Sequence, residues 1–407
     1  MSENPVLRPI DFQPVQHQGE PMWLLRDPLQ LSPRQLLVPP ALAQVLIFCD
    51  GSRDLPEIHR AVSDHLGFPI PYDTVAHLLT QLDESFLLDN RRSRHAKKDL
   101  LAAFRAQPAR PPAIAGLSYA ADPVILRNEL TEYGFGDDLS GWSHEAAAGT
   151  RAIISPHIDY MRGGPVYART WARAKAAVAD ADLVVMFGTD HNGGLGSLTL
   201  TRLPYATPFG VIPTDTELVD KLAHSIGEDA AYALELNHQQ EHAIELSAVW
   251  LHHIAGDNPP PMVPVLCGSF HHFVTRGGHP ESDAAIEAFL ETLQRETAGR
   301  RVLAVASVDF AHVGPNFGDE FAMDGPRREQ LRRQDASLME AISQGDATRF
   351  YNEIAAVEDQ NRICGFSSIY LLLRYLDITK GVTIAYDHCA ADDQDNSLVS
   401  IAGMLLE

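Results

Sequence analysis

The sequence lacks long apolar runs and is poor in cysteine. No stretch of its 407 residues approaches the roughly 20 apolar residues that a membrane-spanning helix needs. The N-terminal residues carry neither the basic cluster nor the apolar run of a signal peptide. The four cysteines (Cys49, Cys267, Cys364 and Cys389) are scattered and form no CxxC pair. These absences argue against a membrane partner and against a disulfide framework, and they predict a cytoplasmic protein.

Positive charge is also scarce. Lysine and arginine number 32 against 54 acidic residues, which gives a formal net charge of −22. A chain with this balance is not expected to bind nucleic acid or an anionic membrane surface. The basic residues between Arg91 and Lys98 are interpreted as a solvated surface of a linker. The length predicts two or three domains with a sizeable core.

The chain divides near residue 110 into a front part and a longer second part. After an N-terminal segment (residues 1–38), residues 39–95 have the pattern of helix, turn, two helices and a short closing strand over 85–90. Apolar residues recur at helical spacing between Val75 and Leu87, so one face of that helix is apolar. Residues 96–112 are charged and Pro-rich, as in "AQPARPPAI", and are predicted to be a linker.

The front part resembles the PqqD-like domains, which are small winged-helix modules that recognise peptides. The resemblance rests on "LIFCDGSRDLPEIHRAV" followed by "VAHLLTQLDESFLLD". It implies that residues 39–95 bind a peptide or protein substrate. A winged helix that serves only packing or dimerisation is the alternative.

From residue 113 to 407 short strands alternate with helices. The apolar runs "RAIISPH", "ADLVVMFGTDH", "PMVPVLCGSF" and "RVLAVASVDFAH" have the composition of buried strands, and amphipathic stretches separate them. This pattern predicts an α/β fold with a central, largely parallel or mixed sheet covered by helices on both faces. Ligands of such folds bind beyond the carboxyl ends of the strands.

Three of these strand ends carry acidic and imidazole side chains. A single histidine at a strand end is most often an ordinary loop residue, but the repetition favours a common site. The residues are His157, Asp159 and Tyr160 after the first strand, Asp190 and His191 after the second, and Asp309 and His312 after the fourth.

Two further segments add candidates. In "QQEHAIELSAVWLHHI" the spacing predicts one helix that presents His238, Glu241, His242 and Glu245 on a single side. Such a cluster is more often a solvated face than a site. Cys364 precedes a glycine at the predicted start of an apolar helix, where the helix dipole and open N–H groups stabilise a thiolate.

Taken together, these stretches resemble the Memo family, also called AmmeMemoRadiSam system protein B, whose fold is similar to that of class III (LigB-type) extradiol dioxygenases. The matching segments occur in family order over residues 113–407: "GLSYAADPVILRNEL", "SPHIDYMRGGPVYA", "GTDHNGG", "EHAIELSAVWL", "SVDFAHVG", "ICGFSSIYLLL" and "DNSLVSIAGMLL".

The resemblance implies a metal site. Its ligands would be His157, His191 and Cys364, and catalytic residues in the same pocket would be His242, Asp309 and His312. Tyr160 and Asp190, at the same strand ends, are further catalytic candidates. Asp159 and Asp190 stand where the family usually has small residues, so two extra acids are expected near the metal. The family name also implies radical-SAM or other maturation proteins as partners.

Two imidazoles and a thiolate leave an open coordination position, as catalytic metal sites do. They suit iron, copper or zinc rather than magnesium or calcium. The leading hypothesis is therefore an iron- or copper-dependent redox enzyme that uses dioxygen and modifies a peptide presented by residues 39–95. Two alternatives stay open: a non-catalytic metal- and peptide-binding protein, and a zinc-dependent hydrolase.

Overall fold

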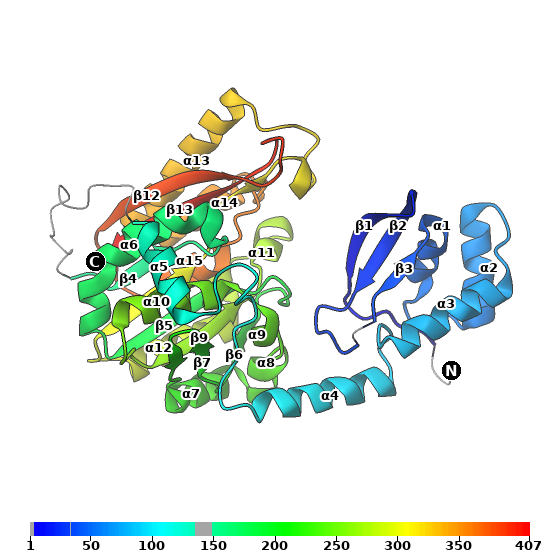
Figure 1. Ribbon diagram of the computed structural model, residues 1–407, viewed down its shortest axis with the longest axis horizontal. Coiled ribbons are helices and arrows are strands. Elements are labelled where there is room, and N and C mark those ends of the chain that lie inside the picture. The colour runs from blue at the N-terminus through cyan, green and yellow to red at the C-terminus, as the bar shows by residue number, and fades with distance from the viewer. Residues whose placement is uncertain (1–3, 33, 135–148) are drawn as a thin grey trace. The chain divides into compact units, whose positions relative to one another are not determined.

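The computed structural model describes residues 4–32, 34–134 and 149–407 of the chain. These residues form two compact units, Met1–Gln107 and Pro108–Glu407, which we call the N-terminal and C-terminal units (Figure 1). Residues 1–3, at which a signal peptide would begin, lie outside the described residues. Among the helices described, none is both long and apolar enough to cross a bilayer.

The N-terminal unit combines a small antiparallel sheet with helices. Its strands, in the order β1-β2-β3, are Asp11–His17, Glu20–Arg26 and Leu36–Val38. The helices are α1 (Pro40–Ala43), the 3-10 helix η1 (Gln44–Phe48), α2 (Leu55–Leu66), α3 (Tyr72–Glu84) and α4 (Arg91–Arg105). The side chain of Asp54 caps α2 by accepting a hydrogen bond from the backbone N–H of Glu57. The apolar face predicted for α3 is buried, as its spacing requires.

Several details of the front part differ from the sequence-based expectation. The short strand expected over residues 85–90 is an isolated bridge between Leu7 and Leu88. The sheet over residues 11–38 had no counterpart in the prediction. Helix α4 includes the basic run and part of the segment expected as a linker, and the boundary between the units falls at Gln107–Pro108. The winged-helix classification stays a prediction.

The C-terminal unit is built on a mixed sheet of eight strands. Its order is β11-β13-β4-β10-β5-β9-β6, with β12 paired to β13. Strands β4, β10, β5 and β9 run parallel, whereas β13 and β6 are antiparallel to their neighbours. The strands are β4 (Ala152–Ser155), β5 (Leu183–Thr189), β6 (Leu198–Leu200), β9 (Met262–Cys267), β10 (Val302–Ser307), β11 (His312–Val313), β12 (Gly381–Ala390) and β13 (Leu398–Leu406). The predicted α/β fold with a mixed sheet is confirmed.

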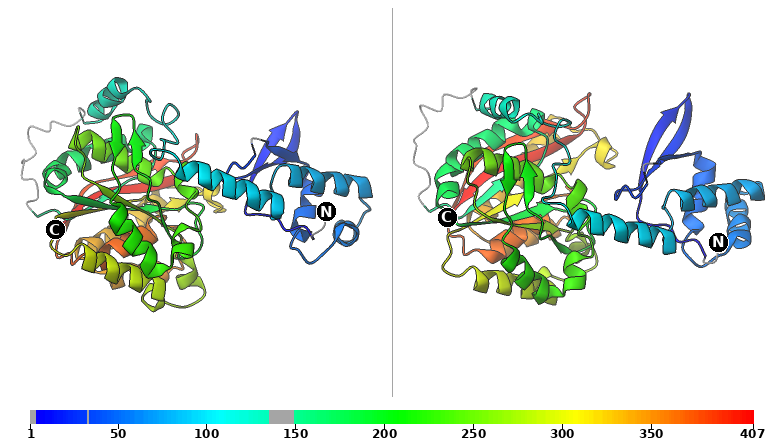
Figure 2. Two further views of the ribbon diagram at one scale, coloured as in Figure 1. Left: turned by 90° about the horizontal axis from the view of Figure 1, so that it is seen from below. Right: turned by 60° about the horizontal axis from the view of Figure 1, so that its bottom comes forward.

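Helices cover both faces of this sheet, as Figure 2 shows in two views. Alternate residues of β5 enter different cores: Val185 and Phe187 belong to one hydrophobic cluster, Val184 and Met186 to the other. Packed in the first cluster are α7 (Thr216–Ile226), α12 (Ala284–Glu296), α13 (Gly325–Ser343), α14 (Ala347–Ala355) and α15 (Phe366–Tyr375). Packed in the second are α5 (Pro123–Glu132), α6 (Tyr160–Asp180) and α10 (Ala243–Ala255).

The remaining elements of the C-terminal unit are short. They are β7 (Tyr205–Thr207), β8 (Gly210–Ile212), α8 (Glu228–Tyr232), α9 (Asn237–Gln240), α11 (His271–Thr275) and the 3-10 helices Pro280–Ser282 and Pro315–Phe317. Strands β7 and β8 form a separate two-stranded hairpin.

Candidate metal centre

The ends of three neighbouring parallel strands bring three of the predicted site residues together. Ser307 at the end of β10 is in register with Ser155 of β4 on one side and Gly188 of β5 on the other. His157, His191 and Asp309 each lie two residues beyond the last residue of their strand. Because parallel strands end at the same edge of the sheet, the three residues meet there.

His242 reaches the same place through a break in a helix. The single helix predicted for the segment around residue 242 is wrong: α9 ends at Gln240, and Glu241 has an extended backbone (φ −72°, ψ 128°) before α10 begins. The Glu241 carboxylate accepts hydrogen bonds from the backbone N–H groups of His242 and Ala243, at 2.8 and 3.0 Å. It therefore satisfies N–H groups that a helix start leaves open, and the break directs His242 toward the strand ends.

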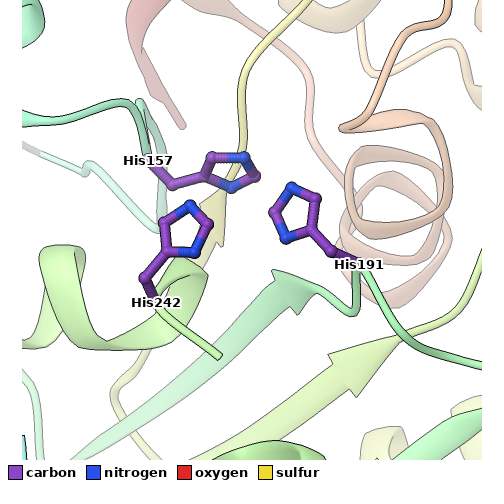
Figure 3. Close-up of side chains that lie close together, drawn as sticks. All are labelled: His157, His191 and His242. Atoms are coloured by element: carbon purple, nitrogen blue, oxygen red, sulfur yellow. The ribbon is translucent and has the colours of Figure 1, made fainter. Parts of the chain in front are cut away.

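Three imidazole rings converge in this region (Figure 3). The ring centroids of His157 and His191 are 5.0 Å apart, those of His191 and His242 are also 5.0 Å apart, and those of His157 and His242 are 5.5 Å apart. One ligand atom from each ring lies within 4.8 Å of the other two. The three side chains come from separate segments of the chain and point toward one another, which is the arrangement of a metal-binding cluster.

An oxygen acceptor lies close to the outer nitrogen of each ring and orients the ring. Nδ1 of His157 contacts the carbonyl oxygen of Ser307 at 3.0 Å. Nδ1 of His191 contacts the Glu241 carboxylate at 3.0 Å, and Nδ1 of His242 lies 3.2 Å from the same carboxylate. These acceptors place the proton on Nδ1 and leave Nε2 of each ring for the centre of the cluster, as in metal-ligating histidines.

Cys364 adds a sulfur atom to the cluster. It directly precedes Gly365 and α15, as predicted, and its Sγ lies 3.4 Å from Nε2 of His157. The backbone N–H of Asp309 donates to Sγ at 3.3 Å. Burial acts to raise the pKa of Cys364, but the charges and hydrogen bonds of His157 and His191 outweigh it and lower the pKa to about 5. The sulfur is therefore held as a thiolate, the form that binds metals.

The thiolate and the carboxylates in turn act on the imidazoles. Burial acts to lower the pKa of His157, but Cys364 and Asp309 raise it to about 9. Burial likewise opposes protonation of His191, yet Glu241 and Cys364 raise its pKa well above the usual range. His242 differs, because burial dominates and lowers its pKa to about 4. A metal ion that binds here displaces protons from the first two rings.

Glu241 lies at the site, although from the sequence it is predicted only as part of a helix face and not among the metal or catalytic residues. Its carboxylate is 4 % exposed and also accepts a hydrogen bond from the backbone N–H of His191, at 2.9 Å. Burial acts to raise its pKa, but His191 and His242 hold it well below its usual range. A buried carboxylate between two imidazoles orients both rings. The position of Glu241 directly before His242 could have indicated a role at the site. The prediction of one continuous helix instead favoured a solvated face for Glu241.

Asp309 supports His157 from the other side. Its Oδ1 accepts hydrogen bonds from the backbone N–H groups of His157 and Ile158, at 2.9 and 3.2 Å. Its Oδ2 lies 3.7 Å from Nε2 of His157. The carboxylate therefore fixes the loop after β4 and adds negative charge beside the ring.

The cluster opens into a pocket of about 550 Å³. Its lining includes five of the predicted site residues, together with Asp159, Arg162 and several apolar side chains. The predicted residues are His157, His191, His242, Asp309 and His312; the apolar ones include Ile114, Leu246, Phe317 and Val399. Asp159 forms an ion pair with Arg162 and caps α6, so its charge is engaged by a neighbour in the pocket wall.

Two predicted catalytic residues lie outside the lining of this pocket. Tyr160 is buried in the first turn of α6 and donates its hydroxyl to the carbonyl oxygen of Leu246 at 2.6 Å. Asp190 accepts hydrogen bonds from the side-chain amide of Asn237 at 3.0 Å and from the backbone N–H of Asn192 at 3.1 Å. Burial raises the pKa of Asp190 to about 6. Both side chains support the loops around the cluster rather than face its centre.

His238, one turn before the cluster, provides a test by pH. Burial lowers its pKa to about 3; Nδ1 accepts from the Tyr205 hydroxyl at 2.6 Å and Nε2 donates to the Thr199 carbonyl at 3.1 Å. In the unfolded chain the imidazole of His238 is protonated near pH 6.5, whereas in the folded protein it stays neutral at that pH. The free energy of unfolding therefore keeps its full value above pH 6.5 and decreases as the pH falls below it. We expect the free energy of unfolding to decrease by about 2 kcal/mol between pH 7 and pH 5 because of His238 alone.

The measurement compares the wild type with His238→Gln, whose amide can form both hydrogen bonds but does not titrate. Urea titrations followed by far-UV ellipticity at pH 7 and pH 5 give the free energy of unfolding of each protein. The difference in free energy of unfolding between the two proteins is expected to change by about 2 kcal/mol from pH 7 to pH 5. The same difference at both pH values would contradict the neutral, buried state of His238.

Comparison with known proteins places these features in a wider context. The sequence model of a family described as "Memo-like protein" matches residues 110–405. A MEMO1 family protein of Aquifex aeolicus is 28% identical over 406 residues, which cover 98% of this chain and 99% of that protein. A MEMO1 family protein of Archaeoglobus fulgidus is 28% identical over 269 residues, covering 65% of this chain and 86% of that protein. The similarity to the Aquifex protein extends over both units.

Proposed function

The chain belongs to the family of Memo-like proteins, and on this basis we propose that its C-terminal unit is a metal-dependent oxidoreductase that uses dioxygen. Iron or copper is the proposed metal, and His157, His191 and Cys364 are the proposed ligands. His242 and His312 are the proposed acid–base groups of the pocket. The proposed substrate is a peptide, bound by residues 39–95 of the N-terminal unit.

The observation that carries the proposal is the spacing of the donor atoms. Two ligands of one tetrahedral ion, an imidazole nitrogen at about 2.1 Å and a sulfur at about 2.3 Å, lie about 3.6 Å apart. Nε2 of His157 and Sγ of Cys364 are 3.4 Å apart, and His191 interacts with the same sulfur. This combination of nitrogen and sulfur donors suits copper, iron or zinc and disfavours magnesium and calcium.

The protein's own residues then define what each part of the pocket does. Bound iron or copper would supply the one-electron redox chemistry that dioxygen requires. Burial lowers the pKa of His242 to about 4, so its ring is uncharged near pH 7 and its free nitrogen can accept a hydrogen bond from a substrate in the pocket. Glu241 and Asp309 orient the surrounding rings and backbone. Ile114, Leu246 and Phe317 supply apolar surface to the lining of the pocket.

Three exposed apolar side chains of the N-terminal unit are the proposed contacts of the peptide. Ile47, Phe68 and Tyr72 are exposed by 61%, 51% and 44%. All three lie within residues 39–95, on a unit with its own hydrophobic core. A bound peptide that covered these side chains would remove their apolar surface from water, which favours binding. Maturation proteins, including radical-SAM enzymes, are further proposed partners.

The first experiment measures the metal content of the intact protein, purified without chelators, beside Cys364→Ser. Near-stoichiometric iron or copper is expected in the wild type and a clear loss in the variant, because a ligand is removed. Oxygen consumption by the loaded wild type is then recorded with and without a combinatorial peptide library. Uptake that depends on both the metal and the peptide supports the oxidoreductase proposal.

The same assay separates the alternatives. Zinc with no oxygen uptake would favour a hydrolase, and the absence of metal from both proteins would favour a pocket that only binds. Ile47→Asp is expected to abolish the peptide-dependent uptake and to leave the metal content unchanged. Val124→Asp, the same kind of change at a residue of the C-terminal unit that is 67% exposed, is the matched control.

A further inference from the structure

Arg110 is completely buried at the start of the C-terminal unit. The exposed fraction of its side chain is 0%, and that of its ion-pair partner Glu245 is 1%. Removing two charges from water costs so much free energy that a buried ion pair is weak grounds for a role in stability. The other contacts of the pair show which parts of the protein it holds.

The guanidinium of Arg110 binds the segment that leads to His242. Its Nε donates to the carbonyl oxygen of His238 at 2.7 Å, and its Nη2 donates to the carbonyl oxygen of Glu241 at 2.6 Å. The third nitrogen, Nη1, pairs with Glu245. The planar group also lies over the ring of Tyr205, 5.1 Å from its centroid. The planar guanidinium therefore holds two backbone positions, His238 before the helix break and Glu241 at the break. This break sets the direction of His242.

Glu245 connects the same fork to the wall of the pocket. Its carboxylate accepts hydrogen bonds from the backbone N–H groups of Ala113 and Ile114, at 2.7 and 3.1 Å, and from the hydroxyl of Tyr119 at 2.5 Å. Ile114 is one of the pocket-lining residues. The ion pair thus joins the pocket wall, the start of α10 and the segment that carries Glu241.

We propose that Arg110 is a positioning residue of the metal centre, with Glu245 holding its guanidinium in place. Arg110 fixes the backbone of Glu241, and the Glu241 carboxylate fixes the rings of His191 and His242. The proposal rests on the proposed function only in taking these histidines as part of a metal centre. It also gives a reason for a charged side chain at a fully buried position.

The test replaces Arg110 with lysine, which keeps the charge but has a single nitrogen in place of the planar fork, so it cannot reach His238, Glu241 and Glu245 at once in the same geometry. Intact wild type and Arg110→Lys are titrated with Co²⁺ alone, and the visible d–d bands report the ligand geometry. We expect the variant to bind Co²⁺ about 10–100-fold more weakly, as for other partners that orient metal ligands, and to show shifted bands. Arg8→Lys, which alters the buried ion pair with Asp27 in the N-terminal unit, should change neither quantity.

A second readout does not depend on metal. The nitrogen chemical shifts of the His191 and His242 rings, measured by NMR on metal-free protein, should differ between the wild type and Arg110→Lys. Unchanged shifts together with unchanged Co²⁺ bands would overturn the proposal, even if the variant unfolds at a lower temperature. If the wild type binds no Co²⁺ but the ring shifts still respond, the proposed function fails and the positioning role stands.

A milder variant guards against a failure to fold. Tyr119→Phe removes only the hydroxyl that donates to Glu245 and leaves the ion pair intact. It is expected to change the ring shifts and the Co²⁺ bands in the same direction as Arg110→Lys, but by less. A Tyr119→Phe protein with wild-type bands and ring shifts would contradict the proposed role of Glu245.

Discussion

Replacing His191 by alanine is expected to weaken metal binding by more than about 100-fold. Loss of an outer partner that only orients a ligand typically costs 10–100-fold, so loss of the ligand itself should exceed that range. His191 belongs to both ligand sets that the geometry permits: the cluster of three histidines and the set that contains Cys364. Competition titrations against a chromophoric chelator measure the change directly.

Two further variants decide between the ligand sets. We expect Cys364→Ser to lower the affinity about as much as His191→Ala, and His242→Ala to keep the metal while losing oxygen uptake. Loss of metal in His242→Ala with retention in Cys364→Ser would instead assign the three histidines as the ligands. His224→Ala, at an exposed position of α7, is the control and should behave as wild type.

The second large effect is expected in the core, where Gly403→Ala should destabilise the C-terminal unit by about 3 kcal/mol. Gly403 lies in the buried strand β13, against α6. A Cβ atom added there would lie 1.8 Å from Oγ1 of Thr170. Thr170 is fully buried, and its hydroxyl donates to the carbonyl oxygen of Val166 at 2.7 Å. The clash therefore forces the helix away from the sheet or breaks that hydrogen bond.

Urea unfolding of the intact protein measures this cost. Gly325→Ala is the matched control, since nothing lies within 4 Å of a Cβ atom at that position. Thr170→Ala combined with Gly403→Ala should recover part of the lost stability, because the closest atom is gone while the Thr170 Cβ remains 3.0 Å away. Strictly additive effects of the two substitutions would show that the contact between β13 and α6 is not the cause.

The sheet and much of the site follow from local patterns in the sequence. Strands β4, β5, β9 and β10 are continuous apolar runs bounded by polar residues, and burial on both faces of a sheet requires that composition. Because parallel strands end at one edge, the sequence alone predicts that the residues just beyond them lie close together. His157, His191 and Asp309 do so.

The features that depend on tertiary contacts could not be foreseen. The break at Glu241 is stabilised by hydrogen bonds to groups far away in sequence, whereas the local spacing favoured one helix. Arg110 lies in a Pro-rich segment with the composition of a linker, and only its partner 135 positions later reveals its burial. The strands β1 and β2 carry mostly exposed or half-exposed residues, so the alternation that marks a strand is weak there.

The order in which the site residues are synthesised bears on when the proposed metal could be bound. His157 and Cys364 are 207 positions apart, which corresponds to roughly 10–40 s of translation. Strand β13, which lies between β4 and β11 in the finished sheet, is made later still. A nascent chain therefore exposes both proposed histidine ligands well before the sulfur or the completed sheet exists. The proposed set of ligands is therefore complete only after Cys364 and β13 have been made, and uptake of the proposed metal is expected after synthesis rather than during it.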